Sequence, residues 1–374
     1  MEIKTYDIGR ADCILLREET SIILLDCGVG RQKRVQLKDI NQDINIAQNR
    51  SMVITHFHLD HYRGLKYIAH NKFDKIYLNS FLLLFYSKAN IKLLVKLFQI
   101  YFFITGAHQL PKGVYFILDY LYFCAINLNS TSFGIQFVNS GDKIRDFKDH
   151  IDVIWPDFRG INNSFAQIEE ALDSFCKTNE IDLEKTSMNL SKRFENALYE
   201  LYDKIFSKIS NESNKRLSNE NLQSKEVKEI HKIMVIANQN KEEVDASPNS
   251  YQELNGRLRS LLNDISLVIK NEKVAFFGDV SPRTIWALCH LGRLNNDFFL
   301  IKTPHHGSDT HFSPLLNPCA IFLSCSNNRK KDINNRNSYL AHYPCSFHVF
   351  SNGDVFYRLH IHHNLLNAPI IFNI

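Results

Sequence analysis

Closely spaced cysteines are absent from this sequence of 374 residues. Its eight cysteines are scattered between Cys13 and Cys345, and no CxxC pair occurs. Disulfide frameworks and cysteine-rich zinc sites use such close pairs, so we expect reduced thiols and a cytoplasmic protein. A strong charge bias is missing as well, because 44 basic side chains face 40 acidic ones. A net charge of +4 does not by itself predict binding to nucleic acid.

Long uninterrupted apolar runs are also lacking. The first residues include Glu2, Asp7 and Asp12, which favours a strand over a cleaved signal peptide. The most apolar stretch, residues 81–106, carries three lysines in its middle, and lysines near the centre of a bilayer are costly. We therefore expect a buried or amphipathic helix there and no membrane span. With 44% hydrophobic and 22% charged residues, the composition is that of a globular protein.

Short apolar runs predict strands in both outer parts of the chain. Residues 14–25 have the pattern of a β-hairpin, and further strands are predicted at residues 52–55, 75–78, 133–138, 150–155, 265–269 and 274–279. Between them, residues 157–250 are rich in Glu, Lys, Asn and Ser and show helical spacing. We expect an α/β domain made of two halves, 1–156 and 251–374, interrupted by a helical insertion at 157–250.

A cluster of metal-binding side chains follows the predicted strand at residues 52–55. His56, His58, Asp60 and His61 lie within six residues, where a strand gives way to a loop or helix. Alternate residues of an extended segment project to one side, so these imidazoles and the carboxylate can converge on a metal ion. Neutral histidine and aspartate suit Zn²⁺, and Mn²⁺ or iron also fit. The alternative is a surface histidine cluster without function.

Matching side chains occur further along the chain. Asp279 ends the strand-like run at residues 274–279, and His305 and His306 stand side by side in residues 304–308. A carboxylate at the end of a strand can bridge two metal ions, and a histidine can complete the second coordination sphere. Each motif alone is weak, but three in this order point to a metal centre.

These motifs together resemble those of the metallo-β-lactamase superfamily. Within it, the sequence is similar to the branch of ComEC-type DNA-uptake proteins and their stand-alone relatives. The resemblance is carried by residues 7–13 (DIGRADC), 24–28 (LLDCG), 55–65 (THFHLDHYRGL), 155–156 (WP), 263–268 (NDISLV), 277–279 (FGD), 304–308 (PHHGS) and 338–344 (SYLAHYP). It implies an αββα sandwich that binds two divalent ions, Zn²⁺ or Mn²⁺.

The resemblance also implies roles for individual residues. The first metal would be held by His56 and His58, the second by Asp60, His61 and either His305 or His306, and Asp279 would bridge the two. Asp26 and Asp12 would support ligands from outside the coordination sphere. Asp60 and His342 would take part in catalysis, His342 by lining the site and assisting the leaving group.

One departure from the family pattern concerns the first metal. Many members carry a further histidine between the HxHxDH motif and the bridging aspartate. Here only His70, His108, His150 and His231 fall in that interval, and none stands in a recognisable motif. We therefore expect the first metal site to be weak.

The resemblance favours a phosphodiester substrate, and hence a nuclease that acts on DNA. Lys302 and the basic residues at 329–331 and 336 could meet phosphates, although a solvated charge run has the same pattern. A hydrolase of small esters, lactones or cyclic nucleotides is one alternative. Another is a component of a multi-protein system, such as a defence system, that is active only with a partner. The insertion could then act as a lid or dock a protein partner.

Overall fold

The computed structural model describes most of the two outer parts of the chain and selected segments of its middle. The described residues are 1–9, 11–28, 36–68, 73–80, 92–93, 95–96, 134–182, 192–193, 195–200, 248–294, 297–325, 338–351, 354–357, 360–363 and 370–374. The chain divides into two compact units. Unit 1 comprises Met1–Asn79, Gln136–Phe158 and Asn263–Ile374, and unit 2 comprises Ser80–Ile135 and Arg159–Leu262.

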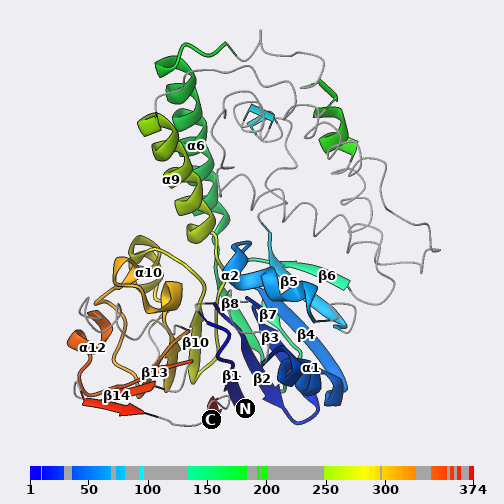
Figure 1. The fold of residues 1–374 in the computed structure, drawn as a ribbon, viewed down its shortest axis with the longest axis vertical. Coiled ribbons are helices and arrows are strands. Elements are labelled where there is room, and N and C mark those ends of the chain that lie inside the picture. The colour runs from blue at the N-terminus through cyan, green and yellow to red at the C-terminus, as the bar shows by residue number, and fades with distance from the viewer. Residues whose placement is uncertain are drawn as a thin grey trace, which may run out of the picture. The chain divides into compact units, whose positions relative to one another are not determined.

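Unit 1 contains two β-sheets (Figure 1). The first has the strand order β16-β1-β2-β3-β4-β5-β6. Its strands are β1 (Glu2–Thr5), β2 (Ile14–Glu18), β3 (Ser21–Leu25), β4 (Asn49–Ile54), β5 (Lys75–Asn79), β6 (Gly134–Val138) and β16 (Ile370–Asn373). The predicted hairpin at residues 14–25 is confirmed, since β2 and β3 pair antiparallel with Ile14 opposite Leu25. Strands β3, β4 and β5 then run parallel.

The second sheet has the order β15-β14-β13-β12-β11-β10-β9-β8-β7. Its strands are β7 (Lys143–Ile144), β8 (Ile151–Trp155), β9 (Val268–Lys270), β10 (Val274–Phe277), β11 (Leu300–Lys302), β12 (Ile321–Ser324), β13 (Phe347–Phe350), β14 (Asp354–Tyr357) and β15 (His360–His363). Strands β10 to β13 are parallel neighbours. The run predicted as a strand at residues 265–269 forms one only from Val268 onward.

One apolar core joins the two sheets face to face. Leu16, Leu25 and Val53 of the first sheet pack in the same buried cluster as Ile269 and Phe276 of the second. The other face of the second sheet is covered by α10 (Pro282–His290) and α12 (Ser338–His342), whose apolar side chains pack against β10 to β12. Helix α1 (Gln36–Ile46) lies against the first sheet (Figure 1). This layering is that of a two-sheet α/β sandwich, as expected from the sequence.

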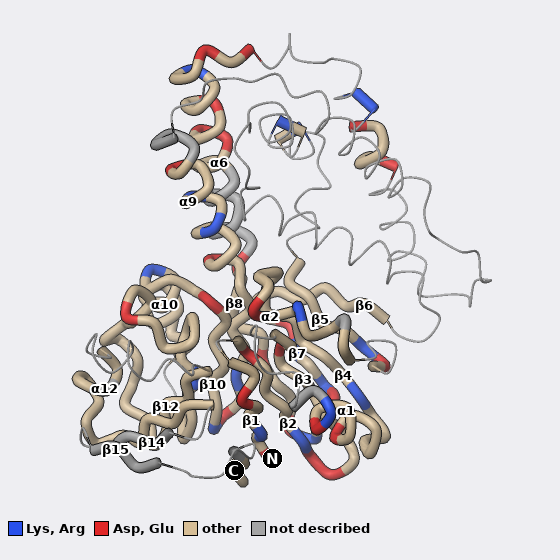
Figure 2. Tube along the Cα trace, in the orientation of Figure 1, with Lys and Arg blue, Asp and Glu red and all other residues tan. Residues whose placement is uncertain are grey.

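The carboxylate of Asp43 on helix α1 is hydrogen-bonded to side chains of the first sheet and of the residue that follows β1. Asp43 accepts hydrogen bonds from Lys4 and Tyr6, each at 2.5 Å, and from Arg17 at 2.9 Å. Basic and acidic segments interleave around β1, β2 and α1 (Figure 2). Burial acts to raise the pKa of Asp43, but these three donors outweigh it and lower the pKa. The ionised form is therefore the one that the fold stabilises.

This carboxylate makes stability depend on pH on the acid side. A lowered folded-state pKa means that the stabilisation is present above the unfolded pKa, about 3.9, and is lost as pH falls through the folded pKa. We expect Asp43→Asn to lower the free energy of unfolding at pH 7 by about 1–3 kcal/mol and to flatten its fall toward acid. Urea unfolding between pH 7 and pH 3 measures both effects. Asp149→Asn, at an exposed position, is the control, and an unchanged acid slope in Asp43→Asn would contradict the assignment.

Most of the described part of unit 2 is helical. Helix α6 (Phe158–Thr178) begins at the end of unit 1, and α9 (Pro248–Asp264) leads back to it. Each buries one face, with Ile168, Leu172 and Phe175 on α6 and Leu254, Leu258 and Leu261 on α9. None of the helices in the described residues is long and apolar enough to cross a membrane. Residues 81–106 lie almost wholly outside the described part, so the helix predicted there stays a prediction, as do the boundaries 157–250 of the insertion.

Candidate metal centre

The carboxyl ends of parallel strands from both sheets meet at one edge of unit 1. The HxHxDH segment follows β4, Asp26 follows β3, Asp279 follows β10, and His305 and His306 follow β11. Backbone hydrogen bonds join these ends, from Leu267 N to Thr55 O at 3.0 Å and from His305 N to Gly278 O at 3.2 Å. Such an edge is where α/β proteins place their ligands.

Backbone hydrogen bonds hold the HxHxDH segment against the loop before β2 and the loop after β3. Asp12 N donates to Asp60 O at 3.0 Å, and Cys27 N donates to His61 O at 2.6 Å. Helix α2 (Leu59–Tyr62) thus begins beside Gly28. A Cβ atom on Gly28 would lie 1.7 Å from Asp60 O, a distance that no side chain tolerates. Only glycine allows the two loops to approach this closely.

Gly28→Ala should therefore displace Asp60 and His61. We expect a loss of about 1–3 kcal/mol of stability from the forced shift, together with a much weaker metal site. Thermal unfolding and zinc titration of the purified variant measure the two effects. Gly256→Ala on α9 is the matched control, because a Cβ there meets nothing within 4 Å, and it should slightly raise stability. Wild-type zinc affinity in Gly28→Ala would refute this role of the close approach.

Asp279 occupies the centre of the cluster. Its Oδ1 lies 3.2 Å from His61 Nε2, and its Oδ2 lies 3.6 Å from His56 Nε2. His56, His58 and Asp279 together present ligand atoms within 4.8 Å of one another. Within the described residues, neither oxygen of Asp279 accepts a hydrogen bond, nor does Nε2 of His56 or His61 take part in one. Buried polar atoms are rarely left this way, and a bound cation would satisfy all four.

The adjacent residues His305 and His306 point to different parts of the cluster. Both lie in the short turn Pro304–Gly307 with left-handed backbone angles, φ +45° and +58°. His306 Nε2 lies 3.0 Å from Asp60 Oδ2, whereas His305 Nε2 lies 3.6 Å from Asp279 Oδ2. Left-handed geometry at two non-glycine residues is uncommon and tends to occur at functional sites.

Asp26 determines the tautomers of two histidines. It accepts hydrogen bonds from His61 Nδ1 and from the Thr55 hydroxyl, both at 2.8 Å. Because that hydroxyl gives its one proton to Asp26, its oxygen accepts Nδ1–H of His56, 3.1 Å away. Both rings therefore carry their proton on Nδ1 and direct the lone pair of Nε2 toward Asp279. This is the arrangement in which imidazole binds a metal.

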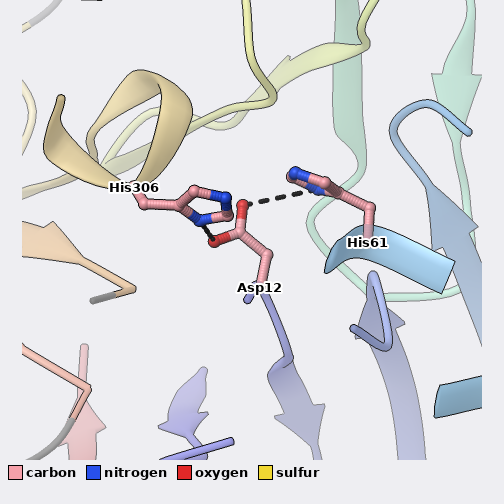
Figure 3. Close-up of side chains that lie close together, drawn as sticks. All are labelled: Asp12, His61 and His306. Atoms are coloured by element: carbon pink, nitrogen blue, oxygen red, sulfur yellow. Dashed lines mark hydrogen bonds and ion pairs between the residues drawn. The ribbon is translucent and has the colours of Figure 1, made fainter. Parts of the chain in front are cut away.

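Asp12 supports the opposite side of the cluster (Figure 3). It lies 2.9 Å from His306 Nδ1 and 3.6 Å from His61 Nδ1, and its other partner is the buried ammonium of Lys302. Asp12, His61 and His306 could in principle hold a metal among themselves. The ammonium beside Asp12 opposes a cation there. Asp12 instead is hydrogen-bonded to Nδ1 of His306, whose Nε2 faces Asp60.

Burial and charge set the protonation of the cluster. Burial lowers the pKa of His56 and His58, which favours neutral imidazoles. For His61 and His306 burial is outweighed by nearby carboxylates, which raise the pKa, in His306 to about 9. The surrounding imidazoles in turn hold the pKa of Asp279 well below its usual range, against the effect of burial. Without a bound ion, the raised pKa values favour doubly protonated rings at His61 and His306, and binding of a cation would release their Nε2 protons and turn both nitrogens into donors.

Other residues singled out in the sequence lie elsewhere. His342 is exposed, and its ring contacts those of Phe312 and Tyr343. His150 is half-exposed and pairs with Asp152 at 3.3 Å, while His70, His108 and His231 lie outside the described residues. Lys302, which we expected could meet phosphates, is buried and donates to Phe277 O, so that expectation is wrong. The basic residues at 329–331 and 336 lie outside the described part.

The sequence pattern did not reveal His311. It follows His305 by six residues in the short turn Asp309–His311, and the Nδ1 atoms of the two rings are 2.9 Å apart. A lone histidine outside any motif carried no signal. Its separation from His305 by six residues becomes informative only once the structure shows that the turn brings the two rings into contact.

Buried imidazoles on both sides of one carboxylate, at the edge of a two-sheet α/β fold, define a candidate centre for two divalent metal ions. The family model described as the metallo-beta-lactamase superfamily matches residues 6–93, which include Asp12, Asp26 and the whole HxHxDH segment. Members of this superfamily are generally hydrolases that bind divalent metals. No curated protein matches the chain.

Proposed function

We propose that this protein is a metal-dependent hydrolase of the metallo-β-lactamase superfamily. The observation that carries the proposal is the buried carboxylate of Asp279, with each oxygen facing an imidazole nitrogen that makes no hydrogen bond within the described residues. The family match covers only residues 6–93, but Asp279 and His306 lie far outside it and still converge on the same cluster. That convergence supports extending the assignment to both halves of unit 1.

The residues present fit two divalent ions. His56, His58 and Asp279 would hold the first, and Asp60, His61, His306 and Asp279 the second. Donor atoms about 2.0–2.2 Å from one tetrahedral ion lie roughly 3.3–3.6 Å apart, and the distances around Asp279 are 3.2 Å and 3.6 Å. When bound, such ions supply Lewis acidity that activates water and stabilises negative charge on the substrate.

The protein's own groups prepare this site. Asp26 and Asp12 keep the Nδ1 protons of His61 and His306 directed away from the centre, so that Nε2 can act as a donor. Asp60 is 38% exposed and His305 23%, whereas Asp279 is almost fully buried. Substrate therefore approaches along the edge with Asp60 and His305. His342, exposed beside Phe312, remains our proposed contributor to leaving-group departure.

We propose further that the substrate is a phosphodiester, in DNA. Support comes from the motifs at residues 263–268, 277–279 and 304–308, which lie outside the matched segment and resemble those of ComEC-type proteins. Phosphodiester hydrolysis also suits a centre that can neutralise charge on a phosphoryl oxygen. A cytoplasmic location, and a protein partner that docks on the helical insertion at 157–250, belong to the same proposal.

Hydrolysis of labelled single- and double-stranded DNA by the full chain, with Zn²⁺ or Mn²⁺, tests this function. We expect cleavage that disappears in Asp60→Ala/His61→Ala and persists in His290→Ala, a control on the exposed side of α10. Polymer binding should weaken steeply as salt rises. Metal binding without DNA cleavage, but with hydrolysis of a cyclic nucleotide or lactone, would overturn the DNA assignment while keeping the hydrolase. Absence of bound metal would overturn both.

A further inference from the structure

His305 faces the same carboxylate oxygen as a ligand of the first metal. Asp279 Oδ2 lies 3.6 Å from His305 Nε2 and 3.6 Å from His56 Nε2, while Asp279 Oδ1 faces His61. Each oxygen of the bridging carboxylate thus belongs to one side of the centre. His305 lies on the side of His56, and His306 lies on the side of Asp60. Successive left-handed residues separate the two rings, whose centroids are 5.6 Å apart.

The other nitrogen of His305 is engaged by His311. Their Nδ1 atoms are 2.9 Å apart and their ring centroids 4.1 Å apart. At this distance one nitrogen carries a proton and the other accepts it. The Thr310 hydroxyl, also 2.9 Å from His311 Nδ1, can direct its proton to Ser308 Oγ at 2.8 Å. Which of the two histidines donates the proton in this hydrogen bond therefore depends on the tautomer of His311.

Asn263 selects that tautomer. Its side-chain nitrogen is placed 3.5 Å from His311 Nε2, and its side-chain oxygen is buried without a hydrogen-bond partner in the described part of the chain. The two ends of an amide are assigned from their hydrogen bonds, and the opposite orientation gives the oxygen a donor in Nε2–H of His311. His311 Nδ1 then accepts Nδ1–H of His305. This leaves the Nε2 lone pair of His305 directed at the Asp279 side.

We propose that His305 is the third imidazole ligand of the first metal, with His56, His58 and Asp279, and that His311 and Asn263 are positioning residues for it. This inference rests on the proposed function, namely that the centre holds two divalent ions. Three neutral imidazoles and one carboxylate form a nitrogen-rich set suited to Zn²⁺. The first site is then complete without a histidine between residues 61 and 279.

Metal stoichiometry and affinity of the full chain test the proposal without reference to catalysis. Metal-free protein is titrated with Zn²⁺ against a chromophoric chelator, and bound zinc is counted by mass spectrometry after gel filtration. We expect two zinc ions in the wild type, one in His305→Ala and two in His290→Ala. His56→Ala/His305→Ala should lose no more than one ion, because both side chains belong to one site. Thermal unfolding of the metal-free variants checks that each is folded.

Variants of Asn263 and His311 test the two positioning residues, and Asn263→Leu and Asn263→Asp form a matched pair. Asn263→Leu and His311→Phe should keep two ions but weaken the first site about 10- to 100-fold. Asn263→Asp retains an acceptor for His311 Nε2–H and should keep the wild-type affinity, which a merely structural role would not predict. These variants also decide the matter if His305→Ala does not fold.

The outcomes separate this inference from the function on which it rests. A wild-type chain that binds no zinc contradicts the proposed function, and the inference falls with it. Two ions bound with wild-type affinities in both His305→Ala and Asn263→Leu overturn the inference alone. Equal weakening of both sites in His305→Ala also overturns it, because the ring would then not belong to one metal.

Discussion

Asp279→Asn is expected to empty both metal sites and to abolish hydrolysis. The amide has the shape of the carboxylate but lacks its charge and one of its two oxygen donors, and each of those oxygens faces a different group of imidazoles. We expect at least a 1000-fold loss of activity, since the carboxylate that we propose as the bridge would contribute to both ions at once. Loss of only one bound ion would contradict the bridging role.

Zinc-dependent stabilisation provides the measurement for this variant. An ion present at 100 times its Kd stabilises the folded state by about 2.7 kcal/mol per site. The wild-type melting temperature should therefore rise on addition of zinc, and that of Asp279→Asn should not. Asp152→Asn, at a half-exposed position in β8, is the control and should respond like the wild type.

The second large effect is expected from Lys302→Met, which should destabilise the fold by about 3–5 kcal/mol. Lys302 and Asp12 are both buried, and the ammonium also donates to Phe277 O at 2.7 Å. Removing the lysine leaves a carboxylate in the interior without its strongest partner. Lys302 thus stabilises Asp12 in the charged form that orients His306.

Urea unfolding of the wild type and three variants, Lys302→Met among them, tests this account. Lys302→Met/Asp12→Asn should recover part of the lost stability, because no uncompensated charge remains, yet its zinc affinity should stay low since His306 loses its orienting group. Lys143→Met is the control, because this lysine is 42% exposed and its pairing with Asp152 contributes at most about 1 kcal/mol. Equal stability of Lys302→Met and the wild type would contradict the account.

Patterns within short stretches of sequence were enough to predict those elements and candidate ligands that depend only on neighbouring residues. The alternation at residues 14–25 gave the hairpin, and the spacing of His56, His58, Asp60 and His61 indicated a cluster before any fold was considered. The strand predicted from Ile265 begins only at Val268, because helix α9 continues to Asp264 and Ser266 N then donates to Asn263 O in the turn that follows. Leu267 N donates to Thr55 O, in a segment far away in the sequence. Periodicity does not record such a contact between distant segments.

Other parts of the site depend on backbone angles and distant partners. The sequence left open whether His305 or His306 is a ligand, because nothing in the PHHGS motif reveals that both residues are left-handed and point apart. Lysine next to a motif suggests an exposed phosphate contact, and its burial is understandable only once Asp12 is known to be its partner. His311 and Asn263 became recognisable for the same reason, through contacts that only the folded chain makes.

The distance along the chain between the two halves of the centre has a consequence for biosynthesis. Asp12 and His306 are 294 residues apart, and His306 and Asp60 are 246 apart. During translation, the HxHxDH segment therefore emerges from the ribosome long before Asp279 and the Pro304–Gly307 turn have been synthesised. The nascent chain can offer a metal only a partial set of donors, and capture of both ions has to wait until the second sheet has closed onto the first. For the metal centre that we propose, we accordingly expect uptake to be a late event in the maturation of this protein.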